Sequence, residues 1–286
     1  MDDALRCAIE AALGTRISRA ARVHGGDVAI AYAVELDDDR RVFAKTHPSS
    51  PPGFFTTEAT GLAWLRETDA VAVPEVLAVS DDPPNHLVLE WIDEGGARSS
   101  TERDLGVNLA RLHRAGAPTF GRADRRSTGS RGLPNEPCTT WAEFYAANRL
   151  MPLARLAREG RALGPSTITD LERLAGRLDA FDTGEPPARL HGDLWAGNRL
   201  VDVVAGRSWL IDPAAHGGHR EFDLAMMRLF GGFAGACFDA YAEVYPLEPG
   251  WEDRVALHQI APLVVHAIKF GGGYVGAAAA AIAQYT

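Results

Sequence analysis

Residues 190–198 read Leu-His-Gly-Asp-Leu-Trp-Ala-Gly-Asn, and this stretch decides how the rest of the sequence is interpreted. It places Asp193 and Asn198 five residues apart, directly after a short apolar run. A later apolar run ends at Asp212, fourteen residues beyond Asn198. The sequence therefore presents two carboxylates and one amide next to short predicted strands.

Such a set of side chains suits phosphoryl transfer, in which the protein mainly positions the reactants and neutralises charge. The Asp193 carboxylate can orient an acceptor hydroxyl and take its proton, and geometry rather than a large pKa shift would make it effective. The Asn198 amide oxygen and the Asp212 carboxylate are hard ligands of the kind that Mg²⁺ prefers. We therefore predict Asp193 as the catalytic base and Asn198 and Asp212 as metal ligands. The alternative is a structural turn with a satisfied Asp and Asn.

The pattern of the chain changes near residue 92. Before it, a helical stretch at 2–13 and a helix at 54–68 accompany short alternating or β-branched runs. These runs cover 16–23, 28–36, 41–45, 75–79 and 86–91. After residue 92, long helical stretches dominate, at 101–115, 139–160, 166–181, 220–244 and 251–269. We predict an α+β fold with a β-rich lobe over residues 1–92 and a mostly helical lobe over residues 93–286.

Lysine is rare among the cations of this chain. Of 29 lysine and arginine residues, only Lys45 and Lys269 are lysines. A lysine in such a background hints at a site that needs a compact ammonium group rather than the planar guanidinium of arginine, although chance is a competing explanation. Lys45 ends the third predicted strand, so it is the lysine that could belong to a site.

These motifs, in this order, resemble the kinase-like fold, in particular the small-molecule kinases that include the aminoglycoside and choline phosphotransferases. More specifically, the chain is similar to the fructosamine kinase (ketosamine 3-kinase) family nearly end to end. The most diagnostic block is 218–226, Gly-His-Arg-Glu-Phe-Asp-Leu-Ala-Met, which aminoglycoside and choline kinases lack. Further matching segments are 42–45, 58–62, 109–113, 132–135, 141–144, 191–198, 211–214 and 229–232.

The resemblance implies ATP-dependent phosphorylation of the 3-hydroxyl of a ketosamine, a sugar attached to an amine by glycation. The resulting 3-phosphate falls apart and frees the amine, so the activity amounts to deglycation. It also implies ATP and Mg²⁺ as cofactors and a bilobal, protein-kinase-like architecture. In that architecture residues 1–92 bind the nucleotide, and residues 93–286 carry the catalytic groups and bind the acceptor, a small-molecule or protein-bound ketosamine.

The resemblance further assigns nucleotide contacts in the first lobe. Lys45 resembles the lysine that holds the ATP phosphates, and Glu58 on the next helix resembles its ion-pair partner. By analogy, the carbonyl of Glu90 and the amide of Ile92 would hydrogen-bond adenine. A plain buried strand is compatible with the same two residues.

Residues on the acceptor side are assigned by their place near the predicted catalytic loop. Trp195 either lays its ring against a sugar face or packs beneath the loop. His219, Arg220 and Glu221 border the acceptor site or shape its floor, and hydrogen bonding at a helix start is the simpler alternative to zinc ligation. Asp223 is expected to brace the catalytic loop through its backbone amides.

Three segments depart from the patterns of related proteins. Only Gly25 and Gly26 stand where protein kinases have their glycine-rich loop, so this turn is assigned by position alone. Relatives carry aromatic residues where this chain has Ala-His-Gly at 215–217, and the segment 122–131 is more basic and polar than theirs. The last two segments leave the exact sugar open, either ribose-derived or glucose-derived.

Charge and composition exclude other classes of protein. The chain has 38 acidic and 29 basic residues, a net charge of −9, which argues against non-specific binding of nucleic acid. An acidic start and the absence of a long apolar run argue against a signal peptide and a membrane helix, so we expect a cytoplasmic protein. Three distant cysteines indicate neither a disulfide framework nor a zinc cluster. The sequence leaves the oligomeric state undecided.

Two other functions remain open from the sequence. One is a small-molecule kinase of the aminoglycoside or choline phosphotransferase type, which shares the catalytic residues. The other is a non-catalytic nucleotide-binding protein. It is disfavoured because a chain without turnover has no chemical need for both Asp193 and Asp212.

Overall fold

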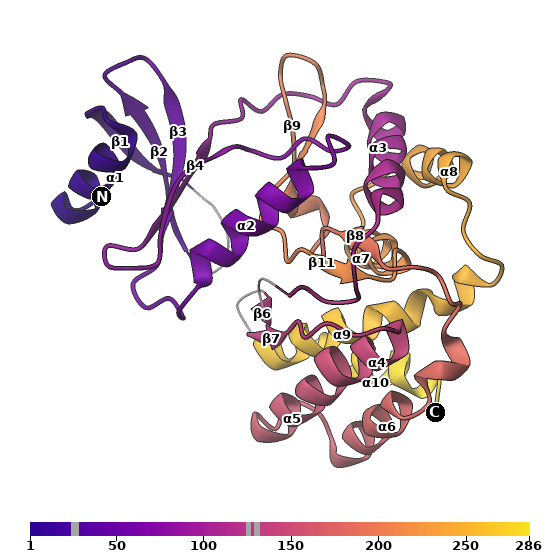
Figure 1. Cartoon of the computed structure of the whole chain (residues 1–286). Helices are drawn as coiled ribbons and strands as arrows, with labels where there is room; N and C mark the ends of the chain where they lie inside the picture. The colour runs from indigo at the N-terminus through magenta and orange to yellow at the C-terminus, as the bar shows by residue number, and fades with distance from the viewer. Residues whose placement is uncertain (24–28, 124–126, 129–131) are drawn as a thin grey trace. The chain divides into compact units, whose positions relative to one another are not determined.

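The computed structural model of the chain describes residues 1–23, 29–123, 127–128 and 132–286. It divides into two compact units (Figure 1). The first comprises Met1–Thr101 and Arg199–Pro213, and the second comprises Glu102–Asn198 and Ala214–Thr286. The first unit is built on a sheet and the second is mostly helical, which agrees with the predicted α+β class.

The first unit contains a five-stranded antiparallel sheet in the order β1-β2-β3-β5-β4. Its strands are β1 (Ile17–Val23), β2 (Ile30–Leu36), β3 (Arg41–Thr46), β4 (Val76–Ser80) and β5 (His86–Glu90). Helix α1 (Asp3–Leu13) begins at Asp2, whose side chain accepts the N–H of Leu5, and ends at Gly14 in the left-handed conformation. The five strands and this helix confirm the elements that alternation and capping residues predict for the first 92 residues.

The alternation of side chains along β3 determines where Lys45 points. Val42 and Ala44 belong to the apolar cluster formed with Leu5 and Ile9 of α1. Because successive side chains of a strand point to opposite faces, Lys45 lies on the other face of the sheet. Helix α2 (Phe54–Arg66) packs against β4 and β5, and Figure 1 shows α1 and α2 on opposite sides of the sheet.

The first unit extends beyond residue 92 because the chain there is bonded to a distant hairpin, β9 (Arg199–Val201) and β10 (Ser208–Leu210). The Gly95 N–H donates to the Val201 carbonyl at 2.8 Å, and the Val203 N–H donates to the Asp93 carbonyl at 2.9 Å. A Cβ atom on Gly95 would lie 2.5 Å from the Val203 Cα, so only glycine permits this approach. The hairpin that ends next to Asp212 is thereby fixed to the β-rich unit, whereas the sequence pattern groups it with the helical lobe.

The second unit packs helices around a short antiparallel strand pair, β8 (Ala188–Leu190) and β11 (His216–Gly218). Its helices are α3 (Thr101–Ala115), α4 (Trp141–Tyr145), α5 (Met151–Glu159), α6 (Pro165–Ala175), α7 (Glu221–Phe230), α8 (Gly235–Val244), α9 (Trp251–Phe270) and α10 (Gly273–Ala283). Helix α9 packs against α5, α7 and α10, and the apolar core lies among these helices. The loop 191–198 follows β8 directly, and α7 follows β11.

Three predicted helical stretches are interrupted. In 166–181, helix α6 ends at Ala175 and a separate 3-10 segment covers Leu178–Phe181. Gly231 and Gly232 have φ angles of 69° and 86°, so the stretch 220–244 is two helices, α7 and α8. Glycine adopts this left-handed backbone without steric cost. The stretch 139–160 instead contains a π-helical segment, Ala146–Leu150, between α4 and α5.

The polar stretch 116–138 contains two short paired strands, β6 (Ser127–Thr128) and β7 (Leu133–Pro134). Its ends are tied together by reciprocal backbone hydrogen bonds between Phe120 and Cys138. In the described ranges, no helix combines the length and the apolar character that crossing a membrane requires.

Candidate active site

In the first unit, Lys45 forms two ion pairs on the face of the sheet that α2 covers. Its Nζ lies 2.7 Å from Oε1 of Glu58, which α2 carries, and it also donates a hydrogen bond to Oδ1 of Asp212. The Lys45 residue is only 8% exposed, so the charged group is held away from bulk water. Residues 45, 58 and 212, far apart in the sequence, thus form one cluster of charged groups.

The electrostatics of this cluster are set by two carboxylates that share one ammonium group. Burial raises the pKa of Glu58 to about 8, with Lys45 opposing the shift and Asp212 adding to it. Burial acts against the charge of Lys45, but the two carboxylates outweigh it and raise the pKa of Lys45. A further cation beside Asp212 would offset the repulsion that Asp212 exerts on Glu58 and so favour the ionised form of Glu58.

Asp212 also has an unusual backbone. Its φ angle is 51°, in the left-handed region that residues other than glycine rarely adopt. Such conformations cluster at functional sites, where the surrounding structure holds them. The residue follows β10 and remains partly exposed, with a side-chain exposure of 35%. Its side chain therefore reaches the surface while it is bonded to Lys45.

In the second unit, Asp223 of α7 braces the loop that follows β8. Its fully buried carboxylate accepts the N–H of His191 at 2.8 Å and the N–H of Gly192 at 2.9 Å, and it faces His113 at 3.3 Å. Burial alone would raise the pKa of Asp223, but the hydrogen bonds and the neighbouring histidines outweigh burial and lower it. This is the brace predicted from the sequence, made through two successive backbone amides.

The same loop brings Asp193 and Asn198 together. The Asn198 Nδ2 donates to the Asp193 carbonyl at 2.9 Å and to Oδ2 of its carboxylate at 3.1 Å. Within the described ranges, the Asn198 Oδ1 accepts no hydrogen bond. Gly192 permits the turn before Asp193, since its φ is 81° and a Cβ atom there would lie 2.2 Å from the Ala214 carbonyl.

Replacing Asp223 with asparagine should loosen this loop. The variant keeps one acceptor oxygen for two loop N–H groups and turns an NH₂ group toward one of them, in a buried site. We expect the free energy of unfolding to fall by about 3 kcal/mol. Chemical denaturation of Asp223→Asn beside the unaltered chain measures this, and an unchanged midpoint would show that the brace contributes little to stability.

The residues predicted on the acceptor side differ in exposure. Trp195 is 41% exposed, its ring covers Gly197, and it meets Phe230 edge-on at 6.2 Å. Its ring therefore lies at the surface of the unit rather than beneath the loop. His219 is buried and lines a small pocket described below.

Arg220 and Glu221 are engaged inside the second unit. The Arg220 guanidinium makes a bidentate pair with Glu185 at 2.7 and 2.6 Å and is only 2% exposed. Both carboxylate oxygens of Glu221 accept hydrogen bonds from Arg254. The ligand atoms of His219, Glu221 and His258 lie within 4.8 Å of one another, yet the Arg254 cation already occupies the carboxylate. The structure thus presents Arg220 and Glu221 as buried ion pairs rather than as groups facing an acceptor.

The predicted adenine contacts lie at the end of β5. The Glu90 N–H donates to the Glu75 carbonyl, and its side chain accepts the Glu75 N–H at 3.1 Å. The Ile92 N–H has no hydrogen-bond partner in the described part of the chain. Gly25 and Gly26 lie outside the described residues.

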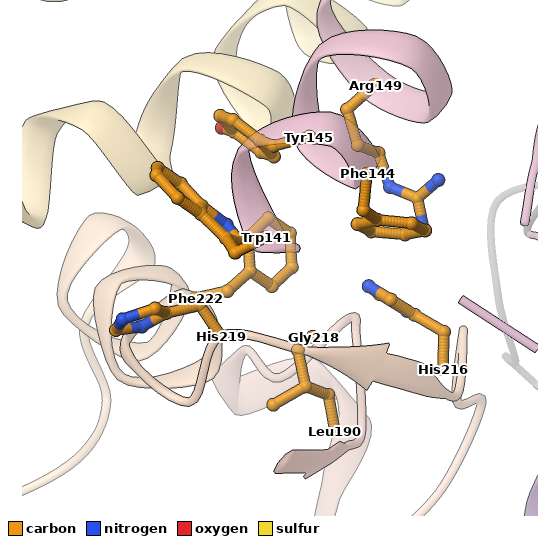
Figure 2. Close-up of a pocket in the computed structure, with 9 residues that line it drawn as sticks. All are labelled: Trp141, Phe144, Tyr145, Arg149, Leu190, His216, Gly218, His219 and Phe222. Atoms are coloured by element: carbon orange, nitrogen blue, oxygen red, sulfur yellow. The ribbon is translucent and has the colours of Figure 1, made fainter. Parts of the chain in front are cut away.

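A pocket that the sequence did not indicate lies within the second unit, beside β8 and β11 (Figure 2). Aromatic side chains form much of its wall, and Arg149 and His216 also line it. His216 pairs with Leu190 across the two strands, and a Cβ on Gly192 would lie 3.0 Å from its Nδ1. The pocket therefore borders the loop that carries Asp193. Arg149 was missed because it is one arginine among 27 and stands in an ordinary helical pattern.

Acid should destabilise the second unit through His216. Burial, followed by the nearby Arg149 cation, lowers the pKa of His216 to about 3, against roughly 6.5 in the unfolded chain. Between these values only the unfolded chain binds the proton, so stability rises with pH in this window and is lost as pH falls.

The variant His216→Asn removes the imidazole that binds this proton in the unfolded chain. Between pH 4 and 5.5, we expect the slope of unfolding free energy against pH to decrease by up to about 1.4 kcal/mol per pH unit. Urea unfolding across this range, with pH 8 as the reference, measures the slope. An identical slope in both proteins would contradict the burial of a neutral imidazole.

Comparison with known proteins identifies relatives of the whole chain. Residues 1–286 match the family model described as fructosamine kinase. A probable ketoamine kinase of Synechocystis sp. is 34% identical over 91% of this chain and 87% of its own length. A chloroplastic protein-ribulosamine 3-kinase of Arabidopsis thaliana is 32% identical over 95% of this chain and 83% of its own.

Solved structures show the same fold. A crystal structure from Thermobifida fusca, assigned as a fructosamine-3-kinase, is 36% identical with a TM-score of 0.91, covering 100% of this chain and 99% of that one. A choline kinase of Streptococcus pneumoniae is 16% identical with a TM-score of 0.64, covering 98% of both chains. At that identity the choline kinase establishes only that the fold is kinase-like.

Proposed function

This chain belongs to the fructosamine kinase family, and we propose from that premise that it transfers the γ-phosphoryl group of ATP to the 3-hydroxyl of a ketosamine. The family match over residues 1–286 is the observation that carries the proposal. The ordered side chains of residues 45, 58, 193, 198 and 212 supply the groups that such a transfer needs. The phosphorylated product decomposes and frees the amine, so the reaction serves deglycation.

In the proposed reaction Asp193 is the catalytic base. Its carboxylate accepts the proton of the acceptor 3-hydroxyl while the oxygen attacks the γ-phosphorus of ATP. The bond between the γ-phosphorus and the β,γ-bridging oxygen breaks, and ADP leaves with that oxygen. The Asn198 amide holds Asp193 by a hydrogen bond to Oδ2, which supports its carboxylate in one orientation.

We assign Asn198 and Asp212 as the residues that would hold Mg²⁺. The Oδ1 of Asn198 accepts no hydrogen bond from the described part of the chain, and the partly exposed side chain of Asp212 shares the Lys45 ammonium group with a second carboxyl group, that of Glu58. Hard oxygen donors of this kind fit Mg²⁺. When bound, the ion supplies neutralisation of the phosphate charge that develops during transfer.

The nucleotide is proposed to bind to the lobe of residues 1–92. Lys45, oriented by Glu58, donates to the phosphates, and the backbone of Glu90 and Ile92 contacts adenine. The buried Lys45–Glu58 pair at 2.7 Å supports the first role, and the unpartnered Ile92 N–H supports the second. Residues 93–286 would supply the acceptor site, and the exposed Trp195 ring offers a face on which a sugar can stack.

A coupled assay for ADP tests the function. The chain is incubated with ATP, Mg²⁺ and one acceptor at a time: a fructosyl-lysine, a ribulosyl-lysine, kanamycin or choline. We expect ADP with a ketosamine only, and ³¹P NMR should place the new phosphate on carbon 3 of the sugar. Turnover of kanamycin or choline without turnover of either ketosamine would overturn the proposal.

A further inference from the structure

The pocket beside the loop of Asp193 contains a buried cation without a counter-charge. Arg149 is 3% exposed and lines the pocket. Its guanidinium donates to the carbonyls of Pro134 and Asn148 at 2.7 and 2.9 Å and to Oδ1 of Asn135 at 2.8 Å. All three acceptors are neutral, and no carboxylate among the described residues pairs with Arg149. Buried charges in proteins are normally paired, so this one is an exception that calls for a ligand.

Arg149 also has unused donor capacity. A guanidinium carries five N–H groups, and the three hydrogen bonds above leave two without a partner in the described ranges. The group lies over the ring of Phe144, 4.6 Å from its centroid. His216 stacks on the same ring at 5.4 Å, and in Figure 2 both side chains point toward Phe144.

The other titratable groups of the pocket do not offset this charge. His216 and His219 are neutral at physiological pH, since burial lowers the pKa of each to about 3. Tyr145 is neutral as well, because burial raises its pKa. Burial lowers the pKa of Arg149 only to about 9, so it remains a cation. Among the lining residues that the structure describes, Arg149 therefore supplies the only charge.

A second arginine, Arg122, lies close to His216. Arg122 is 6% exposed, and its Nη1 lies 3.4 Å from the carbonyl of Ala215, next to His216. Both arginines act on His216 as cations, since each disfavours its protonation. The residues around this pocket thus favour an anion, in surroundings where charge interactions are stronger than in water.

We propose that this pocket binds an anionic oxygen group of the acceptor, with Arg149 as its charged partner. The two oxygens of a carboxylate match the planar, two-donor edge of a guanidinium. This inference rests on the proposed function and narrows its substrate class. The acceptors would be ketosamines that carry a carboxylate on the amine portion, as glycated amino acids do, or a phosphate on the sugar.

Matched pairs of acceptors test the inference in the unaltered protein. Ketosamines of glycine, β-alanine and 4-aminobutanoate are compared with those of the corresponding amides, which have the same length without the charge. A further comparison uses a ketosamine whose amine portion carries no carboxylate, with and without a phosphate on the last carbon of its sugar. For one of the three carboxylate acceptors, or for the phosphorylated sugar, we expect kcat/KM of the anionic acceptor to exceed that of its neutral counterpart by about 10- to 100-fold.

The variant Arg149→Met identifies the partner. Its ratio of kcat/KM for the anionic over the neutral acceptor should fall to about 1, and this ratio is read whatever the absolute turnover. Arg155→Met removes an exposed arginine of α5 that pairs with Glu159, so it serves as the matched control and should keep the original ratio.

A competition measurement does not depend on folding of the variant. Butanoate, added to the unaltered protein, should raise the KM of the anionic acceptor and leave that of the amide unchanged. Equal use of anionic and neutral acceptors in every pair, with ADP formed from both, would overturn the anion site and leave the kinase function standing. No ADP from any ketosamine would instead overturn the proposed function itself.

Discussion

Asp193→Asn should lower kcat for ketosamine phosphorylation by about 1,000-fold while the protein still binds ATP and Mg²⁺. General-base catalysis of this type contributes roughly 10² to 10⁴ in rate. The asparagine is nearly isosteric and can still accept the hydrogen bond from Asn198, so the loop should keep its shape. Single-turnover kinetics measures the chemical step, and fluorescence titration with an ATP analogue measures nucleotide binding.

A matched variant separates the role of Asp193 from a general effect of charge. Asp239→Asn removes an exposed carboxylate of α8 in the same unit and should leave kcat unchanged. If Asp193→Asn retained kcat within a factor of about two, the assignment of Asp193 as the base would be wrong, because such a change is below the smallest expected contribution.

Lys45→Met should impair both stability and turnover. The variant leaves the Glu58 and Asp212 carboxylates near each other without their shared cation. Breaking a buried ion pair by removing one partner costs about 3 to 5 kcal/mol. Loss of the ammonium group from the phosphates should also reduce kcat/KM for ATP by about 100-fold or more, as expected for a charge-assisted contact in a low-dielectric site. Thermal unfolding and the steady-state ADP assay measure the two effects.

The only other lysine in the sequence provides the control. Lys269 is exposed at the end of α9, so Lys269→Met should change neither quantity appreciably. Lys45→Arg tests the need for a compact ammonium, and we expect it to restore less than a tenth of the activity because the planar group has a different shape. Full activity of Lys45→Met would rule out a phosphate contact by this residue.

The first unit follows closely from local sequence patterns. Alternation in 41–45 predicts both strand β3 and the opposite orientations of Ala44 and Lys45, and the ion pair with Glu58 then follows from a helix covering that face. The hairpin 199–213 could not be placed this way. Its attachment to the β-rich unit depends on close backbone packing at Gly95, a long-range contact that leaves no periodic signal in the sequence.

Burial explains why the acceptor side was harder to predict. His219, Arg220 and Glu221 are polar residues in the segment that follows Asp212, but Arg220 and Glu221 are satisfied by Glu185 and Arg254. A sequence shows that charged residues are present and does not show which of them are already paired. For the same reason Arg149 escaped notice, since a sequence does not show that a guanidinium is buried among neutral acceptors.

The brace of the loop by Asp223 illustrates what a local motif can predict. An acidic residue at the start of a helix near a tight turn suggests hydrogen bonds to backbone amides, and the structure has them to His191 and Gly192. The bond between Asn198 and Asp193 also lies within one short loop, although the motif spacing indicated Asn198 only as a metal ligand. Interactions of short range in sequence or with a fixed motif spacing were therefore the predictable part of the site.

One measurement bears on the whole account: a crystal structure with Mn²⁺ in place of Mg²⁺, a non-hydrolysable ATP analogue and a ketosamine. The anomalous signal of the manganese should lie within coordination distance of both the Asn198 and the Asp212 side-chain oxygens, with Asp193 hydrogen-bonded to the 3-hydroxyl of the sugar. A metal bound to other residues, or a sugar whose 3-hydroxyl lies away from Asp193, would contradict the proposed catalytic arrangement.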